Sequence, residues 1–175
     1  MTLWIITGER GSGKTLFCRE LVRLARLDGT NVAGILSPAH FVNGNKESIS
    51  AESIRDGESR MLAHIRKQNP SDLHFGDWYF SRETLAWGNY VITTSIPCDL
   101  LMIDELGPLE FNLKTGWLDA LEVLKKGGYQ QAVVVIRPEL LEVGRAILPP
   151  AETIRVMEEK SALELANEFP GRTKR

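Results

Sequence analysis

The stretch IITGERGSGKTLFC, residues 5–18, decides the fold. Within it, residues 8–15 match the pattern G-x-x-x-x-G-K-[ST] of a phosphate-binding loop, the P-loop. The preceding residues 3–7 form a continuous apolar run, which is typical of a strand buried on both faces. Apolar residues then recur at helical spacing over residues 17–25, until Asp28-Gly29 interrupts the pattern. A glycine-rich loop between a buried strand and a helix predicts a nucleotide phosphate site.

The residue types of this loop indicate which part of a nucleotide each would contact. Glycines allow successive backbone N–H groups to turn inward around a phosphate, and the helix that follows adds the positive end of its dipole. We expect Lys14 to reach the β- and γ-phosphates and the Thr15 hydroxyl to bind Mg2+. The residues expected to contact the nucleotide are Gly8, Glu9, Arg10, Gly11, Ser12, Gly13, Lys14, Thr15 and Leu16.

A pair of carboxylates supplies the second half of the predicted site. Asp104 and Glu105 follow the apolar run of residues 100–103, and acidic residues at the carboxyl end of a buried strand face the same crevice as the P-loop. We expect Asp104 to hold the Mg2+ shell through water. Glu105 would orient or deprotonate the water that attacks the γ-phosphate. The pair favours hydrolysis over phosphoryl transfer.

Three arginines are candidates to stabilise the charge that develops on the γ-phosphate. Arg10 lies inside the loop, Arg137 follows the apolar strand 132–136, and Arg145 lies in the next predicted helix. Arg137 is the first choice, because the end of a neighbouring strand opens onto the nucleotide crevice.

The rest of the chain alternates between predicted strands and helices. This order predicts an α/β fold of three layers, with a mostly parallel central sheet and helices on both faces. A capping box at Ser161 and Glu164 would open the last helix, and Pro170 would end it. The other predicted elements are strands 32–36 and 153–157, a helix 85–96 capped by Ser81, a helix 117–124 closed by Gly127-Gly128, and a helix beginning at Pro138.

Residues 39–77 break this pattern. Turn signals at residues 43–45 and 56–58 predict an inserted hairpin or meander, followed by a mobile loop over residues 68–74. We expect one domain over residues 1–175, in which residues 170–175 are a basic, solvated tail.

Composition excludes several classes of protein. The 175 residues are 43% hydrophobic and 25% charged, which is usual for a soluble domain that needs no disulfide or structural metal. A net charge of −2 gives no reason to expect nucleic acid as the partner, and no apolar run is long enough to span a membrane. Cys18 and Cys98 do not have the spacing of a metal site or of a redox motif. We therefore expect them to be thiols of a protein in the reducing cytoplasm. A zinc site at His40, His64 and His74 is not expected, because they share no ligand spacing.

Base recognition is predicted to be weak. Trp78-Tyr79 could stack on a base, but an aromatic pair before a helix more often packs in the core. The chain has neither an Asn-Lys-x-Asp element nor a Leu-Ser-Gly-Gly signature.

Three segments resemble the cancer-related nucleoside-triphosphatase family of small P-loop proteins. They are residues 6–15, residues 75–80 with the helix that follows, and residues 102–110. The resemblance implies a RecA-like fold and slow, Mg2+-dependent hydrolysis of ATP, GTP and other nucleoside triphosphates. It also implies phosphate and metal roles for Gly8, Gly13, Lys14 and Thr15, and metal and water roles for Asp104 and Glu105. Glu110 would be a supporting carboxylate.

Two alternatives remain open. The chain could be a nucleoside or small-metabolite kinase, with Arg55, Arg60 and Arg66 as a basic lid over the acceptor. It could instead be a nucleotide-gated module that contacts a protein partner through residues 39–77.

Overall fold

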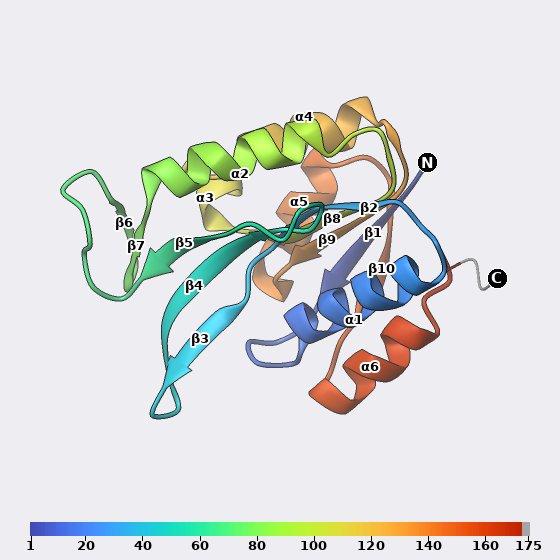
Figure 1. The fold of residues 1–175 in the computed structure, drawn as a ribbon, viewed down its shortest axis with the longest axis horizontal. Coiled ribbons are helices and arrows are strands. Elements are labelled where there is room, and N and C mark those ends of the chain that lie inside the picture. Colours follow the sequence, from blue (N-terminus) through green and yellow to red (C-terminus); the bar gives the residue numbers. More distant parts are fainter. Residues whose placement is uncertain (173–175) are drawn as a thin grey trace.

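One mixed sheet organises the molecule. The computed structural model describes residues 1–172 (Figure 1). In this part of the chain ten strands form the sheet, in the order β10-β1-β9-β8-β2-β4-β5-β7-β6, and β3 pairs with β4 off this path. The strands are β1 (Thr2–Thr7), β2 (Val32–Leu36), β3 (Ala39–Val42), β4 (Asn45–Ser53), β5 (Ser59–His64), β6 (Leu73–Phe75), β7 (Trp78–Phe80), β8 (Cys98–Leu106), β9 (Tyr129–Ile136) and β10 (Ala151–Arg155).

The predicted fold class is confirmed, and the insertion is larger than expected. Strands β10, β1, β9, β8 and β2 are parallel, whereas β4 pairs with β2 antiparallel and starts the inserted strands β3–β7. The insertion is therefore an antiparallel extension of the same sheet. It continues to Phe80 instead of ending at residue 77, and β6 lies partly inside the predicted loop 68–74.

Helices cover both faces of the parallel half. Helices α1 (Lys14–Leu27) and α6 (Glu159–Asn167) lie on one face, as Figure 1 shows. The opposite face carries α2 (Arg82–Thr94), α3 (Pro108–Phe111), α4 (Leu118–Lys126), the 3-10 helix η1 (Pro138–Leu140) and α5 (Leu141–Ile147). No helix within residues 1–172 is long and apolar enough to cross a membrane.

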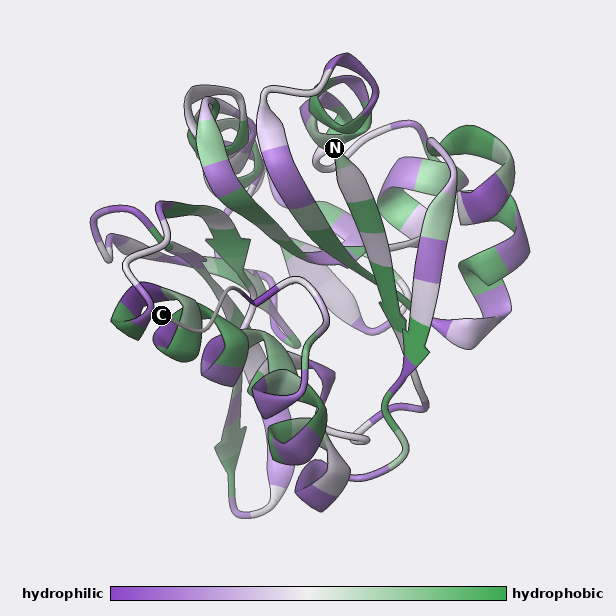
Figure 2. Cartoon of the chain, turned by 90° about the vertical axis from the view of Figure 1, so that its right-hand side faces the viewer, coloured by the Kyte–Doolittle hydropathy of each residue, from purple (hydrophilic) through white to green (hydrophobic). Residues whose placement is uncertain are grey.

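Alternation along the strands divides the core between these two faces. In β1, Leu3 and Ile5 pack beneath α2 and α4, whereas Trp4 and Ile6 pack beneath α1 and α6. All four side chains are buried, which explains why the run is continuously apolar. Figure 2 shows these hydrophobic strands between helices that turn polar residues outward.

Several predicted element ends were wrong. Helix α2 ends at Thr94, not Ile96, because a residue before a proline, here Pro97, disfavours helical backbone. Trp117 is the N-cap of α4 and not part of it, and β10 ends at Arg155 instead of residue 157. Helix α6 begins at Glu159 with Glu158 as its cap, so Ser161 lies inside the helix and does not open it. The cap at Ser81 is confirmed, since its hydroxyl accepts a hydrogen bond from the Thr84 N–H at 3.1 Å.

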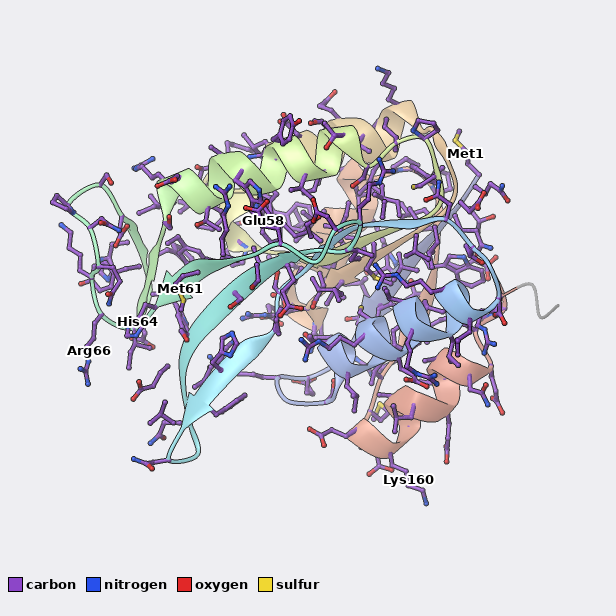
Figure 3. All side chains as sticks on the ribbon, in the orientation of Figure 1. Met1, Glu58, Met61, His64, Arg66 and Lys160 are labelled. Atoms are coloured by element: carbon purple, nitrogen blue, oxygen red, sulfur yellow. The ribbon has the colours of Figure 1, made fainter. Side chains whose placement is uncertain are left out.

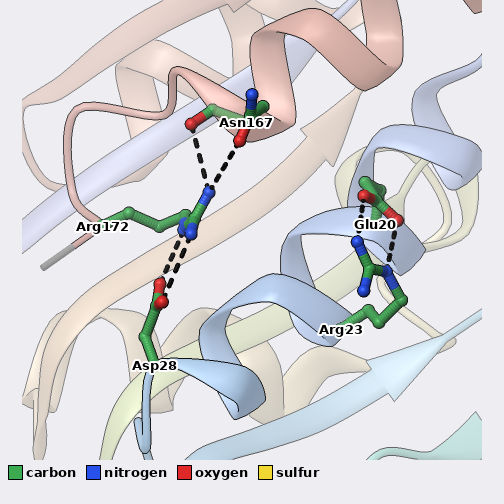
Figure 4. Close-up of polar contacts among 5 residues, drawn as sticks. All are labelled: Glu20, Arg23, Asp28, Asn167 and Arg172. Carbon is green, nitrogen blue, oxygen red and sulfur yellow. Dashed lines mark hydrogen bonds and ion pairs between the residues drawn. The ribbon is translucent and has the colours of Figure 1, made fainter. Parts of the chain in front are cut away.

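The start of the predicted solvated tail is ordered. The Arg172 guanidinium donates two hydrogen bonds to Asp28 at the end of α1, the shorter at 2.7 Å, and its side chain is only 9% exposed (Figure 4). It also donates to Asn167 of α6. This residue fastens the chain after α6 to α1, while residues 173–175 lie outside the described part.

Candidate active site

The two motifs meet at the carboxyl edge of the parallel strands. The P-loop follows β1, Asp104 and Glu105 lie near the carboxyl end of β8, and β9 lies between these two strands. Ser37 follows β2, and its backbone N–H donates to Asp104 at 3.2 Å. The edge of the sheet therefore brings together residues that are about 90 positions apart in the sequence.

Glycines at two loop positions allow the P-loop to pack closely. Gly13 is the N-cap of α1 with φ 96°, a left-handed conformation, and a Cβ there would lie 3.0 Å from Glu159 Cα. A Cβ at Gly8, with φ 158°, would lie 2.1 Å from the Val156 carbonyl oxygen. The segment after β10 thus packs directly against one side of the loop, and larger residues would displace it.

Lys14 is held inside the loop. Its ammonium donates to the carbonyl oxygens of Gly8 at 2.8 Å and of Glu9 at 2.7 Å, and the side chain is buried. Burial lowers the pKa of Lys14, and the nearby Glu105 and Asp104 partly oppose this change. The two carbonyl oxygens balance the charge of the Lys14 ammonium only in part, and an anion bound in the loop would balance it more fully. Of the other predicted contacts, Ser12 is buried, whereas Glu9, Arg10, Gly11 and Leu16 are exposed.

Asp104 is a buried carboxylate suited to a cation. Its exposed fraction is 2%, and burial together with the charge of Glu105 raises its pKa to about 6. Hydrogen bonds from the Ser37 N–H and the Thr15 hydroxyl oppose this rise. Oxygen donors from one carboxylate and one hydroxyl fit Mg2+, which takes its remaining ligands from water and phosphate. Within residues 1–172 no group of three or more His, Cys, Asp or Glu side chains could hold a metal.

Glu105 and Arg137 form an ion pair. Arg137 follows β9, the strand between the two motifs, and its Nε lies 2.7 Å from Glu105 Oε1. Arg145 instead pairs with Glu142 and donates to Thr153. Of the three candidate arginines, Arg10 and Arg137 line the cleft described below, and Arg145 is not among its lining residues.

A cleft of about 210 Å³ extends from these carboxylates. Lys46 of β4 enters it, with its Nζ 5.1 Å from the centre of the Trp78 ring. Burial lowers the pKa of Lys46, against the opposing effect of Glu105. No motif marks Lys46, because it reaches the cleft only through the pairing of β4 with β2. The lining residues that matter here are Arg10, Thr15, Lys46, Phe75, Trp78, Phe80, Leu85, Asp104, Glu105, Trp117 and Arg137.

Other predicted site residues lie elsewhere. Trp78 is half-buried against the core and lines the cleft, whereas Tyr79 stacks on His74 with ring centres 4.5 Å apart. None of the three arginines of the predicted basic lid lines the cleft. Arg55 donates to the carbonyls of Thr94 and Ser95, Arg60 pairs with Glu58, and Arg66 points outward beyond β5 (Figure 3).

Glu110 lies beneath the site and supports its backbone. Its two carboxylate oxygens accept hydrogen bonds from the N–H groups of Gly107 and Trp117, both at 2.8 Å. Burial raises the pKa of Glu110 to about 7, although these hydrogen bonds oppose the rise. The carboxylate thus connects the segment after Glu105 to the start of α4.

Known proteins are similar to this chain in sequence. Nucleoside-triphosphatase THEP1 of Methanosarcina acetivorans is 27% identical over 119 residues, which cover 67% of this chain and 66% of that protein. The protein of the same name from Methanosarcina barkeri is 29% identical over 107 residues, 60% of each chain. The matched region thus spans less than two thirds of these relatives.

Two solved structures share the fold over nearly the whole chain. THEP1 from Aquifex aeolicus superposes with a TM-score of 0.68 at 16% identity, over 96% of each chain. A human cancer-related nucleoside triphosphatase gives a TM-score of 0.72 at 17% identity, over 97% of this chain and 95% of that one. The sequence profile of the NTPase family matches residues 4–165, which include the P-loop, Asp104, Glu105 and Arg137. With the resemblance confirmed, the chain belongs to the NTPase family.

Proposed function

We propose that this protein is an Mg2+-dependent nucleoside-triphosphatase that hydrolyses ATP, GTP and other nucleoside triphosphates to the diphosphate and phosphate. The observation that carries the proposal is the meeting of the P-loop with Asp104 and Glu105 at one edge of the sheet. The names of the relatives agree with this activity.

Binding begins with the triphosphate in the loop. The N–H groups of residues 8–15 and the α1 dipole hold the phosphates, and the Lys14 ammonium leaves the Gly8 and Glu9 carbonyls to contact the β- and γ-phosphates. Thr15 and Asp104 would hold Mg2+, which neutralises phosphate charge when it is bound.

Hydrolysis then needs a base and a cation near the γ-phosphate. Glu105 accepts a proton from the attacking water, an oxygen–phosphorus bond forms, and the bond from the γ-phosphorus to the β-phosphate oxygen breaks. Arg137 holds the Glu105 carboxylate at 2.7 Å and lies close enough to the cleft to balance charge on the γ-phosphate.

Broad base specificity and a cytoplasmic location complete the proposal. The chain has no guanine-reading motif, so we expect the phosphates to supply most of the binding energy. Cys18 and Cys98 are free and buried, which suits a reducing compartment. A protein partner at residues 39–77 stays a prediction; Phe41 and Val42 are exposed there.

The test measures phosphate release from ATP, GTP, CTP and UTP with Mg2+ and with EDTA. We expect all four to be hydrolysed, EDTA to abolish release, and Glu105→Gln to lower kcat about 10²- to 10⁴-fold, because a general base is lost. Glu122→Gln, a change at an exposed position of α4, is the matched control and should leave the rate unchanged.

Equal rates for wild type and Glu105→Gln would remove Glu105 from the mechanism. Absence of release from all four nucleotides in wild type would refute the proposed activity itself. Mant-ATP binding that persists in such a case would show that the P-loop binds without hydrolysis.

A further inference from the structure

The cleft continues well beyond the groups that hydrolysis uses. Past Glu105 its lining includes several aromatic and aliphatic side chains, and Lys46 lies over the Trp78 ring. We propose that this region is a phosphoryl-acceptor site for a molecule that carries a planar aromatic ring and an alcohol group. The proposal rests on triphosphate binding at the P-loop and goes beyond the proposed hydrolysis.

The position of the cleft points to an acceptor and not to the base of the triphosphate. In a P-loop the backbone amides hold the α- and β-phosphates, and the lysine and metal hold the β- and γ-phosphates. Thr15, Asp104 and Glu105, the groups at the γ end, line the cleft, whereas exposed Leu16 and the segment after β10 do not. The nucleoside is attached at the opposite end of the phosphate chain. A molecule in the cleft therefore faces the γ-phosphate.

The wall suits a flat ring. Phe75, Trp78 and Phe80 belong to the β6–β7 hairpin, where Phe75 and Trp78 are paired directly. Leu85 of α2 and Trp117 complete the apolar side. Aromatic faces bind planar rings by stacking. The whole cleft, including the part beside Asp104 and Glu105, measures about 210 Å³, whereas one water needs about 10–15 Å³.

Lys46 places a positive charge in the cleft, over the Trp78 ring. It forms no ion pair with any residue of the described part of the chain, and its Nζ lies 5.1 Å from the centre of the Trp78 ring. An unpaired cation in a half-buried position is well placed to accompany an anion. Lys46 and Arg137 both line the cleft, so they can neutralise a phosphoryl group that moves from the nucleotide toward the ring.

The transfer is balanced without a further reactant. The alcohol oxygen of the acceptor attacks the γ-phosphorus and a phosphate ester bond forms. The bond between the γ-phosphorus and the β-phosphate oxygen breaks, and the nucleoside diphosphate leaves. Glu105 accepts the hydroxyl proton, as it accepts the proton of water when no acceptor is bound. Hydrolysis is then the same reaction with water in place of the alcohol.

The first experiment incubates the full chain with γ-³²P-labelled ATP, Mg2+ and one of three probes: adenosine, thymidine or pyridoxine. Each carries a planar heterocyclic ring and a primary alcohol. We expect at least one probe to yield a labelled phosphate ester at ten or more times the background without probe. The same probe should quench tryptophan fluorescence in the presence of ADP, because Trp78 and Trp117 line the cleft.

Two pairs of variants locate the site. Trp78→Leu should lower the ratio of ester to free phosphate about tenfold or more and remove most of the quenching. Trp87→Leu is its control, because Trp87 contacts Arg60 and does not line the cleft. Lys46→Met should also lower this ratio at least tenfold, whereas Lys67→Met, at an exposed position of the insertion, should leave it unchanged.

Each failure has a distinct meaning. Free phosphate without ester or quenching for any of the three probes would overturn the acceptor site and leave the proposed hydrolysis intact. Ester formation that is equal in Trp78→Leu and Trp87→Leu would overturn the assignment to this cleft. Neither ester nor free phosphate from a well-folded chain would refute the proposed hydrolysis as well.

Discussion

Glu110 shows how a single buried carboxylate can support the backbone of the site. Both of its oxygens accept backbone hydrogen bonds, and a Cβ at Gly116 would lie 2.1 Å from Oε1. Gly116 has φ 78°, so glycine is needed there both for the turn and for the space. The resemblance to known proteins singled out Glu110, whereas its partner Trp117 was expected only as the first residue of the helix 117–124.

Replacing Glu110 with Gln tests this support. Gln has one acceptor oxygen and one amide NH2, so one of the two backbone N–H groups would face a donor. We expect a loss of about 1–3 kcal/mol in unfolding free energy at pH 5, measured by urea denaturation. Glu122→Gln, at an exposed position, should not change the unfolding free energy measurably.

The cost of Glu110→Gln should depend on pH. The pKa of Glu110 rises from 4.5 to about 7 on folding, so between these values the folded chain binds a proton that the unfolded chain has released. Glu110 therefore contributes less stability as pH rises from 4.5 to 7, and the deficit of the Gln variant should shrink by pH 8. A deficit that grows over this range would show that the hydrogen bonds outweigh burial.

Among single residues, the sequence revealed those with local motifs. Four site residues could be predicted because each belongs to a short sequence pattern. Lys14 and Thr15 lie in the P-loop pattern, and Asp104 and Glu105 follow an apolar run. Lys46 could not be predicted, since its neighbours Asn45 and Glu47 indicate only a turn and a polar strand. Its approach to the site depends on which strand pairs with β2, and periodicity does not specify that pairing.

At the scale of elements, Gly34 determines how closely β2 approaches β8. Gly34 pairs with Met102, and a Cβ there would lie 1.9 Å from the Met102 carbonyl oxygen. Its φ of 119° is also unfavourable for other residues. The close approach matters for the site, because β2 carries Ser37 to Asp104 and β8 carries Asp104 itself.

Gly34→Ala should consequently disrupt the pairing of these two strands. We expect a loss of more than about 3 kcal/mol in unfolding free energy, measured by chemical denaturation, since backbone must move. Gly57→Ala is the matched control: Gly57 has φ 78° in a turn with no atom within 4 Å of the added Cβ. Gly57→Ala should lower the unfolding free energy by about 1–2 kcal/mol, because alanine is unfavourable in the left-handed backbone conformation. Equal losses of unfolding free energy in Gly34→Ala and Gly57→Ala would show that the β8 backbone moves away from the added Cβ without strain.

Elements with strong apolar runs were predicted well, and short mixed ones were not. Strands β1, β8 and β9 each contain a run that is buried on both faces, and these runs, residues 3–6, 100–103 and 132–136, are continuously apolar. Strands β6 and β7 have only three residues each and are half-buried at the edge of the sheet. Such segments are too short for an alternation to be recognised, which explains why β6 was expected as part of a loop.

At the scale of the whole molecule, the insertion shares the core of the parallel half. Buried Ala51, Leu62 and Ala63 of the inserted strands belong to the same apolar cluster as Ile5 and Ile103. The cluster continues through α2 and α4, which cover this face of the sheet in Figure 1. We therefore propose that the insertion and the parallel half fold as one unit.

This unity predicts how a change in the insertion alters the unfolding of the entire chain. Leu62 of β5 is 5% exposed, so Leu62→Ala should create a cavity and cost about 2–5 kcal/mol. Its neighbour Met61 is 46% exposed, so Met61→Ala should cost less than about 1 kcal/mol. Far-UV circular dichroism and tryptophan fluorescence, followed during urea unfolding, should shift together in Leu62→Ala. A shared core requires both halves to lose their packing at once, so the two signals should follow one transition. Two separate transitions, of which Leu62→Ala shifts only the one at lower urea concentration, would show instead that the insertion unfolds independently.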